Sequence, residues 1–234
     1  MIDKLEKLNI KESEQLKLQI ENFMKYFLDY NQKVNLISSN DEKVLFEKHI
    51  FDSLAFNLFV QKYDLNPKSK IMDIGTGGGF PAVPISILYK NFNVCAVDSI
   101  NKKINFIKNA KQDLNIQNIK PICSRIEELP ENMKNSFDVV TTRAMAELRM
   151  ILEYAIPFVK QGGYFVAYKS IKAQEEIDNA KNALKILNTR LVDTIEYTLP
   201  IDEENKRVLL IFKKEKNIPS SYPRSNGLVK KKPL

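Results

Sequence analysis

The feature that most restricts the fold of this chain is a glycine-rich stretch at residues 73–81, between an apolar run and a helical pattern. Its sequence, DIGTGGGFP, contains four of the seven glycines in the chain. A strand that turns tightly into a helix there exposes backbone N–H groups, and glycines let a ligand approach the main chain. One glycine suffices for a turn, so we interpret the stretch as a ligand-binding loop.

The loop pattern alone leaves the ligand open. Gly77, Gly79 and Ala82 satisfy the spacing G-x-G-x-x-A, so the motif permits a nicotinamide cofactor. Asp98 ends the next apolar run and can accept the two hydroxyl hydrogens of a ribose. It is also placed to cap the following helix, a role for which Ser99 competes. In either case a nucleoside-containing cofactor fits.

Short apolar runs alternate with helical patterns from residue 70 to residue 188. The predicted strands cover residues 71–74, 93–98, 119–124, 137–142 and 162–169. They are followed in turn by a helix over 81–90, a helix over 101–114, a short turn at 126–130, and helices over 147–158 and 172–188. Five repeats of this kind predict an α/β fold with a parallel sheet and right-handed crossovers. Residues 192–199 and 207–214 have no helix between them and predict a closing antiparallel hairpin.

The pattern of apolar residues divides the chain into three parts. Residues 1–65 are predicted to be a helical extension that packs on the sheet domain, with helices over 11–30 and 41–63, the second capped by Asp41. Residues 66–216 form the sheet domain. Residues 217–234 show no apolar periodicity and are predicted to be a basic tail.

Composition excludes several classes of protein. With 44% hydrophobic and 28% charged residues, the chain is not disordered throughout, and no apolar run approaches the roughly 20 residues of a membrane span. The charged N-terminus shows no secretory signal. Cys95 and Cys123 are expected to be buried thiols in a reducing, cytoplasmic compartment. One histidine and two cysteines cannot form a His/Cys zinc site, and the net charge of +7 weakly favours a polyanionic partner.

Further candidate residues are expected at the rim where the strands end, because ligands of doubly wound sheets bind there. Ile126 and Glu127 follow the third strand and could flank an adenine. Arg143 ends the fourth strand and Lys169 the fifth, and two cations at one crevice favour an anion site for phosphate or carboxylate. His49 has apolar neighbours on a predicted helix and is interpreted as a structural histidine.

Several segments are more specific together than singly. They are YNQKVNL (30–36), KHIFDSL (48–54), DIGTGGGFPAVPISI (73–87), DS with KK (98–99 and 102–103), SRIE (124–127), TRA (142–144), YPR (222–224) and KKKPL (230–234). In this order and spacing they resemble the motifs of the bacterial guanine-N7 methyltransferases of small-subunit ribosomal RNA, also called the glucose-inhibited division protein B family. The resemblance covers almost the whole chain from about residue 20.

The resemblance implies an S-adenosylmethionine-dependent enzyme with a Rossmann-like methyltransferase fold. The implied target is N7 of guanine 527 in the 530 loop of 16S rRNA. The implied cofactor contacts are Gly75, Phe80, Ile126, Glu127 and Arg143, to which the ribose chemistry above adds Asp98. The sequence departs from the common family form at Ala82, where glycine is frequent, and at Thr142, where serine is frequent. Neither change removes a needed functional group.

The RNA contacts are expected elsewhere. Because a guanine methylated at N7 is positively charged, Lys169 is expected to contact phosphate and not the base. Phe80 and Tyr168 are candidates for stacking on the target base, and burial in the core is the alternative. The expected basic arm on the rRNA backbone, with a solvated terminus as its alternative, consists of Arg224, Lys230, Lys231 and Lys232. The expected partner is 16S rRNA, free or in a small-subunit assembly particle, bound by a monomer without metal or membrane.

The implied reaction needs no general acid or base. Guanine N7 carries a lone pair and no proton, so it can attack the sulfonium methyl group directly, and catalysis depends on proximity, alignment and electrostatics. Three other functions remain open from the residues alone. They are a nicotinamide-dependent oxidoreductase, a non-catalytic RNA-binding module, and a methyltransferase for another RNA base or a small molecule.

Overall fold

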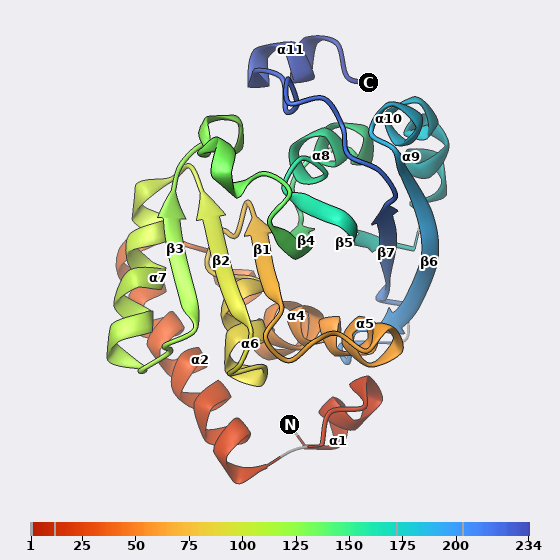
Figure 1. Cartoon of the computed structure of the whole chain (residues 1–234). Helices are drawn as coiled ribbons and strands as arrows, with labels where there is room; N and C mark the ends of the chain where they lie inside the picture. The colour runs from red at the N-terminus through yellow and green to blue at the C-terminus, as the bar shows by residue number, and fades with distance from the viewer. Residues whose placement is uncertain (1, 12, 172, 203) are drawn as a thin grey trace.

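A seven-stranded sheet lies at the centre of the protein in this computed structural model, which describes residues 2–11, 13–171, 173–202 and 204–234 (Figure 1). The strands are β1 (Lys70–Ile74), β2 (Asn93–Asp98), β3 (Ile119–Cys123), β4 (Phe137–Arg143), β5 (Val159–Ser170), β6 (Thr189–Thr198) and β7 (Lys206–Lys214). All seven overlap the predicted strands, and β5 and β6 each begin three residues earlier than expected.

The strand order is β3-β2-β1-β4-β5-β7-β6. Strands β1 to β5 pair in parallel, whereas β7 inserts between β5 and β6 and is antiparallel to both. This confirms the predicted parallel sheet with its antiparallel hairpin. The order reverses between β1 and β4, so the chain after these two strands leaves in opposite directions and opens a crevice at their carboxyl ends.

Helices cover both faces of the sheet, and alternate residues of each strand face opposite layers. Ile71 and Val94 face one core, which is shared with α2, α5, α6 and α7, whereas Met72 and Cys95 face the other, shared with α8, α9 and α10. The bounds of these helices are α2 (Glu14–Val34), α5 (Phe56–Tyr63), α6 (Ala82–Leu88), α7 (Asn101–Asp113), α8 (Leu148–Ala155), α9 (Gln174–Asn179) and α10 (Lys181–Ile186). The predicted helix over 172–188 is therefore two short helices, and its first residue lies outside the described residues.

The N-terminal part is helical, as predicted, but the segment over 41–63 is not one helix. It contains α3 (Ser39–Glu42), a π-helical turn η2 (Phe46–Phe51), α4 (Asp52–Leu54) and α5. Ser38 caps α3, and its Oγ accepts a hydrogen bond from the backbone N–H of Asp41, so Asp41 is not the predicted N-cap. The first elements of the chain are α1 (Ile2–Leu5) and η1 (Glu6–Leu8). A π-helical turn is rare and frequently lies at a functional site.

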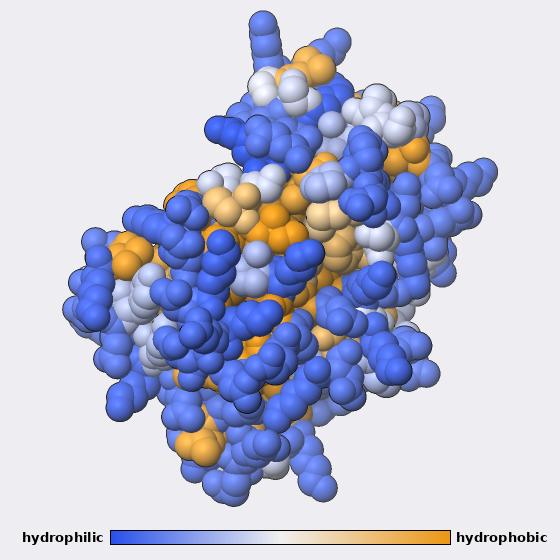
Figure 2. All heavy atoms as spheres, turned by 60° about the vertical axis from the view of Figure 1, so that its left-hand side comes forward, coloured by the Kyte–Doolittle hydropathy of each residue, from blue (hydrophilic) through white to orange (hydrophobic). Residues whose placement is uncertain are grey.

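The C-terminal segment differs from the predicted aperiodic tail. Residues 226–231 form the helix α11 (Asn226–Lys231), and Val229 within it is fully buried against the α8 layer. Helix α11 lies above the carboxyl ends of the strands (Figure 1). In the view of Figure 2, hydrophilic residues cover most of the visible surface of the protein. Hydrophobic atoms are seen in a recess beneath the segment at the top of the picture.

The structure also bears on two expectations from composition, which concern the cysteines and membrane-spanning helices. Cys95 is buried, as predicted, but Cys123 is exposed at the end of β3, so the prediction of two buried thiols is wrong for this residue. Across the described ranges, no helix combines the length and the hydropathy that a membrane span requires.

Candidate active site

The glycine-rich turn follows β1 and has the backbone geometry that only glycines adopt without strain. Gly75 has φ of +70° and Gly79 has φ of +88°, both in the left-handed region. A Cβ atom on Gly79 would lie 2.6 Å from Cγ2 of Val83, which is too close. One on Gly75 would lie 3.3 Å from Sδ of Met145. The turn therefore packs tightly against α6 on one side and against the loop after β4 on the other.

Asp98 holds this turn against the end of β2. One carboxylate oxygen accepts a hydrogen bond from the backbone N–H of Gly77 at 2.9 Å, and the other accepts from the N–H of Ile100 at 2.9 Å. The Nζ atom of Lys103 lies 3.9 Å from the first oxygen. Asp98 thus organises the glycine turn and at the same time holds Ile100, the residue before α7, whereas the helix itself has no side-chain cap from the N-cap position. A carboxylate has further lone pairs, so it can still accept a ligand hydroxyl.

The glycine turn borders a cavity of about 370 Å³, which we name the glycine-loop cavity. It brings together Gly75, Asp98, Ile126 and Glu127, four of the predicted cofactor residues. The other residues that line it include Ser124, Met145, Tyr154, Asn226 and Lys230. Among the described residues the Glu127 carboxylate has no ion-pair partner. The lining thus combines the carboxylates Asp98 and Glu127 with donors, which are Lys103 and Arg125 near the strand ends and Asn226 and Lys230 on α11.

The side chain of Phe80 does not line this cavity. It is buried, with its ring centroid 5.1 Å from that of Phe27 and 5.0 Å from that of His49. Tyr168 is also buried, and its hydroxyl donates to the carbonyl oxygen of Ser53 at 2.8 Å. Of the two alternatives for these rings, the structure favours burial in the core over stacking on a base.

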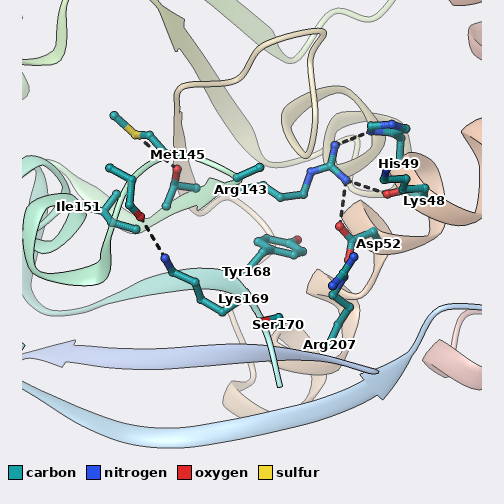
Figure 3. Close-up of a pocket in the computed structure, with 13 residues that line it drawn as sticks. Lys48, His49, Asp52, Arg143, Met145, Ile151, Tyr168, Lys169, Ser170 and Arg207 are labelled. Atoms are coloured by element: carbon teal, nitrogen blue, oxygen red, sulfur yellow. Dashed lines mark hydrogen bonds and ion pairs between the residues drawn. The ribbon is translucent and has the colours of Figure 1, made fainter. Parts of the chain in front are cut away.

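Arg143 ends β4, but its guanidinium turns towards the N-terminal helices (Figure 3). It donates to the carbonyl oxygen of Lys48 and to a carboxylate oxygen of Asp52, both at 2.9 Å, and to Nδ1 of His49 at 2.7 Å. It also lies over the ring of Phe80, 5.4 Å from the centroid. These contacts fix the guanidinium away from the glycine-loop cavity, so the predicted direct contact of this side chain with the cofactor has no support in the geometry.

His49 completes this cluster as a neutral acceptor. Because arginine has no lone pair to offer, Nδ1 of His49 accepts from Arg143, and the ring proton is then on Nε2. Burial and the charge of Arg143 lower the pKa of His49 to about 3. Its buried Nε2 has no partner within the described chain. The contact of Nδ1 with Arg143 agrees with the interpretation of His49 as a structural histidine, whereas that interpretation does not account for the unpartnered Nε2.

A second cavity of about 330 Å³ lies beside this cluster, and we name it the arginine cavity (Figure 3). Its charged lining consists of Asp52 and of the cations Lys48, Arg143, Lys169 and Arg207. Lys169 is not free, since its Nζ contacts Glu176 at 2.6 Å and the carbonyl oxygen of Ala146 at 3.0 Å. Arg207 has no acidic partner in the part of the chain that is described. The sequence interpretation missed Arg207, which lies at the start of the antiparallel strand β7 and is therefore brought beside Ser170 at the carboxyl end of β5.

The loop over 144–146 separates the two cavities and lines both. Ala144 has φ of +51°, and the Oγ1 atom of Thr142 lies 3.7 Å from Sδ of Met145. The sulfur therefore sits between the end of β4 and the glycine turn. No sequence signal marked Met145, because a single methionine in TTRAMAEL has no periodic or motif context.

Asp73 lies under the glycine turn and is fully buried. One of its carboxylate oxygens accepts from the backbone N–H of Ala82 at 3.3 Å, at the start of α6, and the other has no hydrogen-bond partner among the described residues. Burial raises the pKa of Asp73 to about 7. This carboxyl group therefore holds the glycine turn to α6 and lines neither cavity.

The four predicted RNA-binding residues of the C-terminal segment have different environments. Arg224 forms an ion pair with the buried Glu153 at 2.6 Å, which corrects the expectation of a free cation in the tail. Lys230 lines the glycine-loop cavity. Lys231 and Lys232 are exposed and line neither cavity.

Comparisons with known proteins agree with this geometry. The family model described as rRNA small subunit methyltransferase G matches residues 16–208. The ribosomal RNA small subunit methyltransferase G of Lysinibacillus sphaericus (strain C3-41) is 38% identical over 238 residues, which cover 100% of this chain and 97% of that protein. The protein of the same name from Staphylococcus aureus (strain Newman) is 35% identical over 235 residues, with the same shares covered.

Solved structures share the fold at lower identity. TYW2 of M. jannaschii in complex with AdoMet superposes with a TM-score of 0.53 at 16% identity, over 64% of this chain and 70% of that one. The 16S rRNA (adenine(1408)-N(1))-methyltransferase from Catenulisporales acidiphilia gives a TM-score of 0.52 at 15% identity, over 66% and 94% of the two chains. These likenesses support the fold of the sheet domain.

Proposed function

The chain belongs to the rRNA small subunit methyltransferase G family, and from that premise we propose that it methylates N7 of guanine 527 in 16S rRNA. It is an S-adenosylmethionine-dependent rRNA methyltransferase. The observation that carries the proposal is the glycine-loop cavity, where the ends of β1, β2 and β3 meet beside a loop shared with a cationic cavity. A nucleoside cofactor on one side and RNA on the other fit this arrangement.

The residues of the glycine-loop cavity fit S-adenosylmethionine. Asp98 and Glu127 supply carboxylate acceptors for ribose hydroxyls and for an adenine amino group. Gly75 provides a backbone without a side chain at the turn, and buried Ile126 offers an apolar wall for a base. We propose these four residues as the cofactor contacts. For Phe80 and Arg143 we propose a role in holding the site, through their buried cluster with His49.

S-adenosylmethionine supplies an electrophilic methyl group, and guanine N7 supplies the lone pair that attacks it. No proton has to leave N7, so the chain needs only to align the two partners and to exclude water. The buried groups near the crevice are consistent with this. His49 is neutral and engaged with Arg143, and Asp73 lies beneath the turn and outside both cavities.

The arginine cavity suits the RNA side of the reaction. Four cations against one aspartate favour a polyanion, and Arg207 is available for a phosphate. The methylated base carries a positive charge, which a free ammonium group would oppose. Since Lys169 is held by Glu176, its charge is partly neutralised at this position. We therefore propose that Arg207 is the main phosphate contact in this cavity and that Lys169 contributes less.

The cellular setting follows from the substrate. We propose that the chain acts as a monomer in the cytoplasm, where 16S rRNA is assembled, on the free RNA or on a small-subunit assembly particle. Lys231 and Lys232 are exposed cations beside the crevice and are proposed to contact the rRNA backbone, with each phosphate contact adding to the salt dependence of binding.

The test is mass spectrometry of 16S rRNA fragments from cells with and without the gene, followed by reconstitution with purified protein. We expect one additional methyl group at guanine 527 that depends on the protein. A transcript with adenine at position 527 is the control and should receive no methyl group. A methyl group on another nucleotide, or on a small molecule alone, would contradict the assigned target.

A further inference from the structure

The C-terminal helix α11 borders the cofactor cavity although it lies beyond residues 16–208, the range that the family model matches. We propose that Asn226 and Lys230 of this helix bind the adenine end of S-adenosylmethionine, and that the ion pair of Arg224 with Glu153 positions them there. This inference rests on the proposed function only in that the glycine-loop cavity binds the cofactor. It reassigns Lys230, which sequence interpretation placed on the rRNA backbone, and adds Asn226, which that interpretation did not consider.

The anchor of the segment is the buried carboxylate of Glu153 on α8. Arg224 donates to its two oxygens from Nε and from a terminal nitrogen, each at 2.6 Å, and the backbone N–H of Arg224 donates at 3.1 Å. The same terminal nitrogen also reaches the carbonyl oxygen of Lys232 at 3.1 Å. Because Glu153 is fully buried, undocking the segment would leave an unpaired charge, which is costly. The segment is therefore bound firmly to α8.

A second set of contacts orients Asn226. The hydroxyl of Tyr154, the neighbour of Glu153 on α8, donates to Oδ1 of Asn226 at 2.7 Å. With its oxygen engaged, the amide presents its Nδ2 donors, which have no partner within the described residues. Tyr154, Asn226 and Lys230 line the same cavity, one turn of α11 separating the last two. The buried Val229 fixes the face that α11 turns to the cavity.

The chemistry of this wall complements adenine. The adenine ring offers nitrogen acceptors at its edges and one amino group as a donor. Asn226 and Lys230 bring donors to the cavity, and neither has an acidic side-chain partner in the described parts of the chain. Glu127 lines the same cavity and supplies a carboxylate acceptor. Thus the strand ends can accept from the amino group and the ribose, while α11 donates to the ring nitrogens.

The experiment measures binding of S-adenosylhomocysteine and of adenosine by calorimetry, with the full-length protein and without RNA. Lys230→Ala should weaken both ligands about five- to tenfold, and Tyr154→Phe should weaken them less by releasing Asn226. The matched controls are Lys231→Ala and Lys232→Ala, which remove the same charge from the same segment outside the cavity. Both controls should bind within about twofold of the wild type. Thermal unfolding without ligand checks that all four variants fold.

The outcomes separate this inference from the proposed function. If the wild type binds S-adenosylhomocysteine and Lys230→Ala binds it equally well, the role of α11 in the cofactor site is refuted while the methyltransferase assignment stands. An equal loss in Lys231→Ala would also refute it, since general charge would then explain the effect. A wild type that binds neither ligand would contradict the cofactor site itself, and both proposals with it.

Discussion

Asp98→Asn is the substitution that tests the cofactor turn most directly. The two oxygens of Asp98 accept from the backbone N–H groups of Gly77 and Ile100, each at 2.9 Å. An asparagine has the same shape but only one acceptor oxygen, so its NH₂ group must face one of the two N–H donors. The side chain is 8% exposed, and water can replace little of what is lost. The backbone N–H of either Gly77 in the glycine turn or Ile100 before α7 then loses its acceptor.

The expected size follows from one lost hydrogen bond to a charged group, about 1.5–3 kcal/mol. We expect this loss in the free energy of unfolding, measured by urea denaturation. Affinity for S-adenosylmethionine should fall roughly ten- to hundredfold, since about 1.4 kcal/mol corresponds to a factor of ten. The affinity loss combines a displaced turn with a weaker acceptor for the ribose. RNA binding without cofactor should change little, because Asp98 does not line the arginine cavity.

Glu127→Gln is the matched control in the same cavity. Its carboxylate holds no backbone group in place, so the substitution should reduce cofactor affinity and leave the free energy of unfolding unchanged. Calorimetry and urea denaturation of both variants separate the two roles. If Asp98→Asn kept both its stability and its cofactor affinity, the turn would not depend on this carboxylate. A loss of RNA binding with intact cofactor affinity would reverse the assignment of the cavity.

Two further predictions concern the turn and the histidine cluster. Gly75→Val should weaken S-adenosylmethionine binding at least tenfold, because the φ of +70° at this position strains a branched residue and its Cβ would lie 3.3 Å from Sδ of Met145. Unchanged affinity in calorimetry would show that this turn is not part of the cofactor site. The folded-state pKa of His49, about 3, lies below its ordinary value of 6.5, so the stability due to the neutral ring is present above pH 6.5 and is lost as the pH falls towards 3. Wild type should therefore lose about 2 kcal/mol more than His49→Gln between pH 7.5 and pH 5 in urea denaturation, and parallel pH profiles would contradict a buried neutral ring.

Sequence periodicity was sufficient for the sheet, because each strand there is a short apolar run between turns and helical patterns. The glycine turn was equally visible, since positive φ values at Gly75 and Gly79 demand the residues that the sequence shows. Asp98 illustrates the limit. Ribose binding and helix capping were treated as alternatives, whereas the two oxygens of the side chain hold Gly77 in the turn and Ile100 before α7, and the residue still borders the cavity.

The long charged side chains could not be placed from the sequence. Strand position fixes where the Cα atom of Arg143 or Lys169 lies, but the guanidinium and ammonium groups are several bonds away and follow the nearest acceptors. For Arg143 these are Asp52 and the ring of His49, about 90 residues earlier in the chain. For Lys169 the acceptor is Glu176 on the following helix. The Arg143 contacts are long-range and have no local signal, and the Lys169 contact depends on how the loop after β5 folds, so the sequence predicted an anion site where both cations are already paired.

The C-terminal segment shows that similar residues in one stretch of sequence can have different surroundings in the fold. Four cations in an aperiodic stretch predicted a uniform basic arm, yet a single buried acid divides them. Glu153 on α8 holds Arg224, and the segment anchored by this contact brings Lys230 to the glycine-loop cavity and leaves Lys231 and Lys232 outside. Glu153 lies 71 positions before Arg224, and in the sequence it looks like any other charged residue of a helix.

The arrangement of the two cavities bears on how the reaction can proceed. They share the loop over 144–146, and the side chain of Met145 lies between the glycine turn and the end of β4. With the cofactor and the base placed in the two cavities as we propose, the methyl group has to pass across this loop. Methionine is unbranched and has three rotatable bonds, so it can leave the path without moving the strands. In the proposed reaction the strand ends and the glycine turn would hold the two partners, and the flexible side chain of Met145 would lie between them.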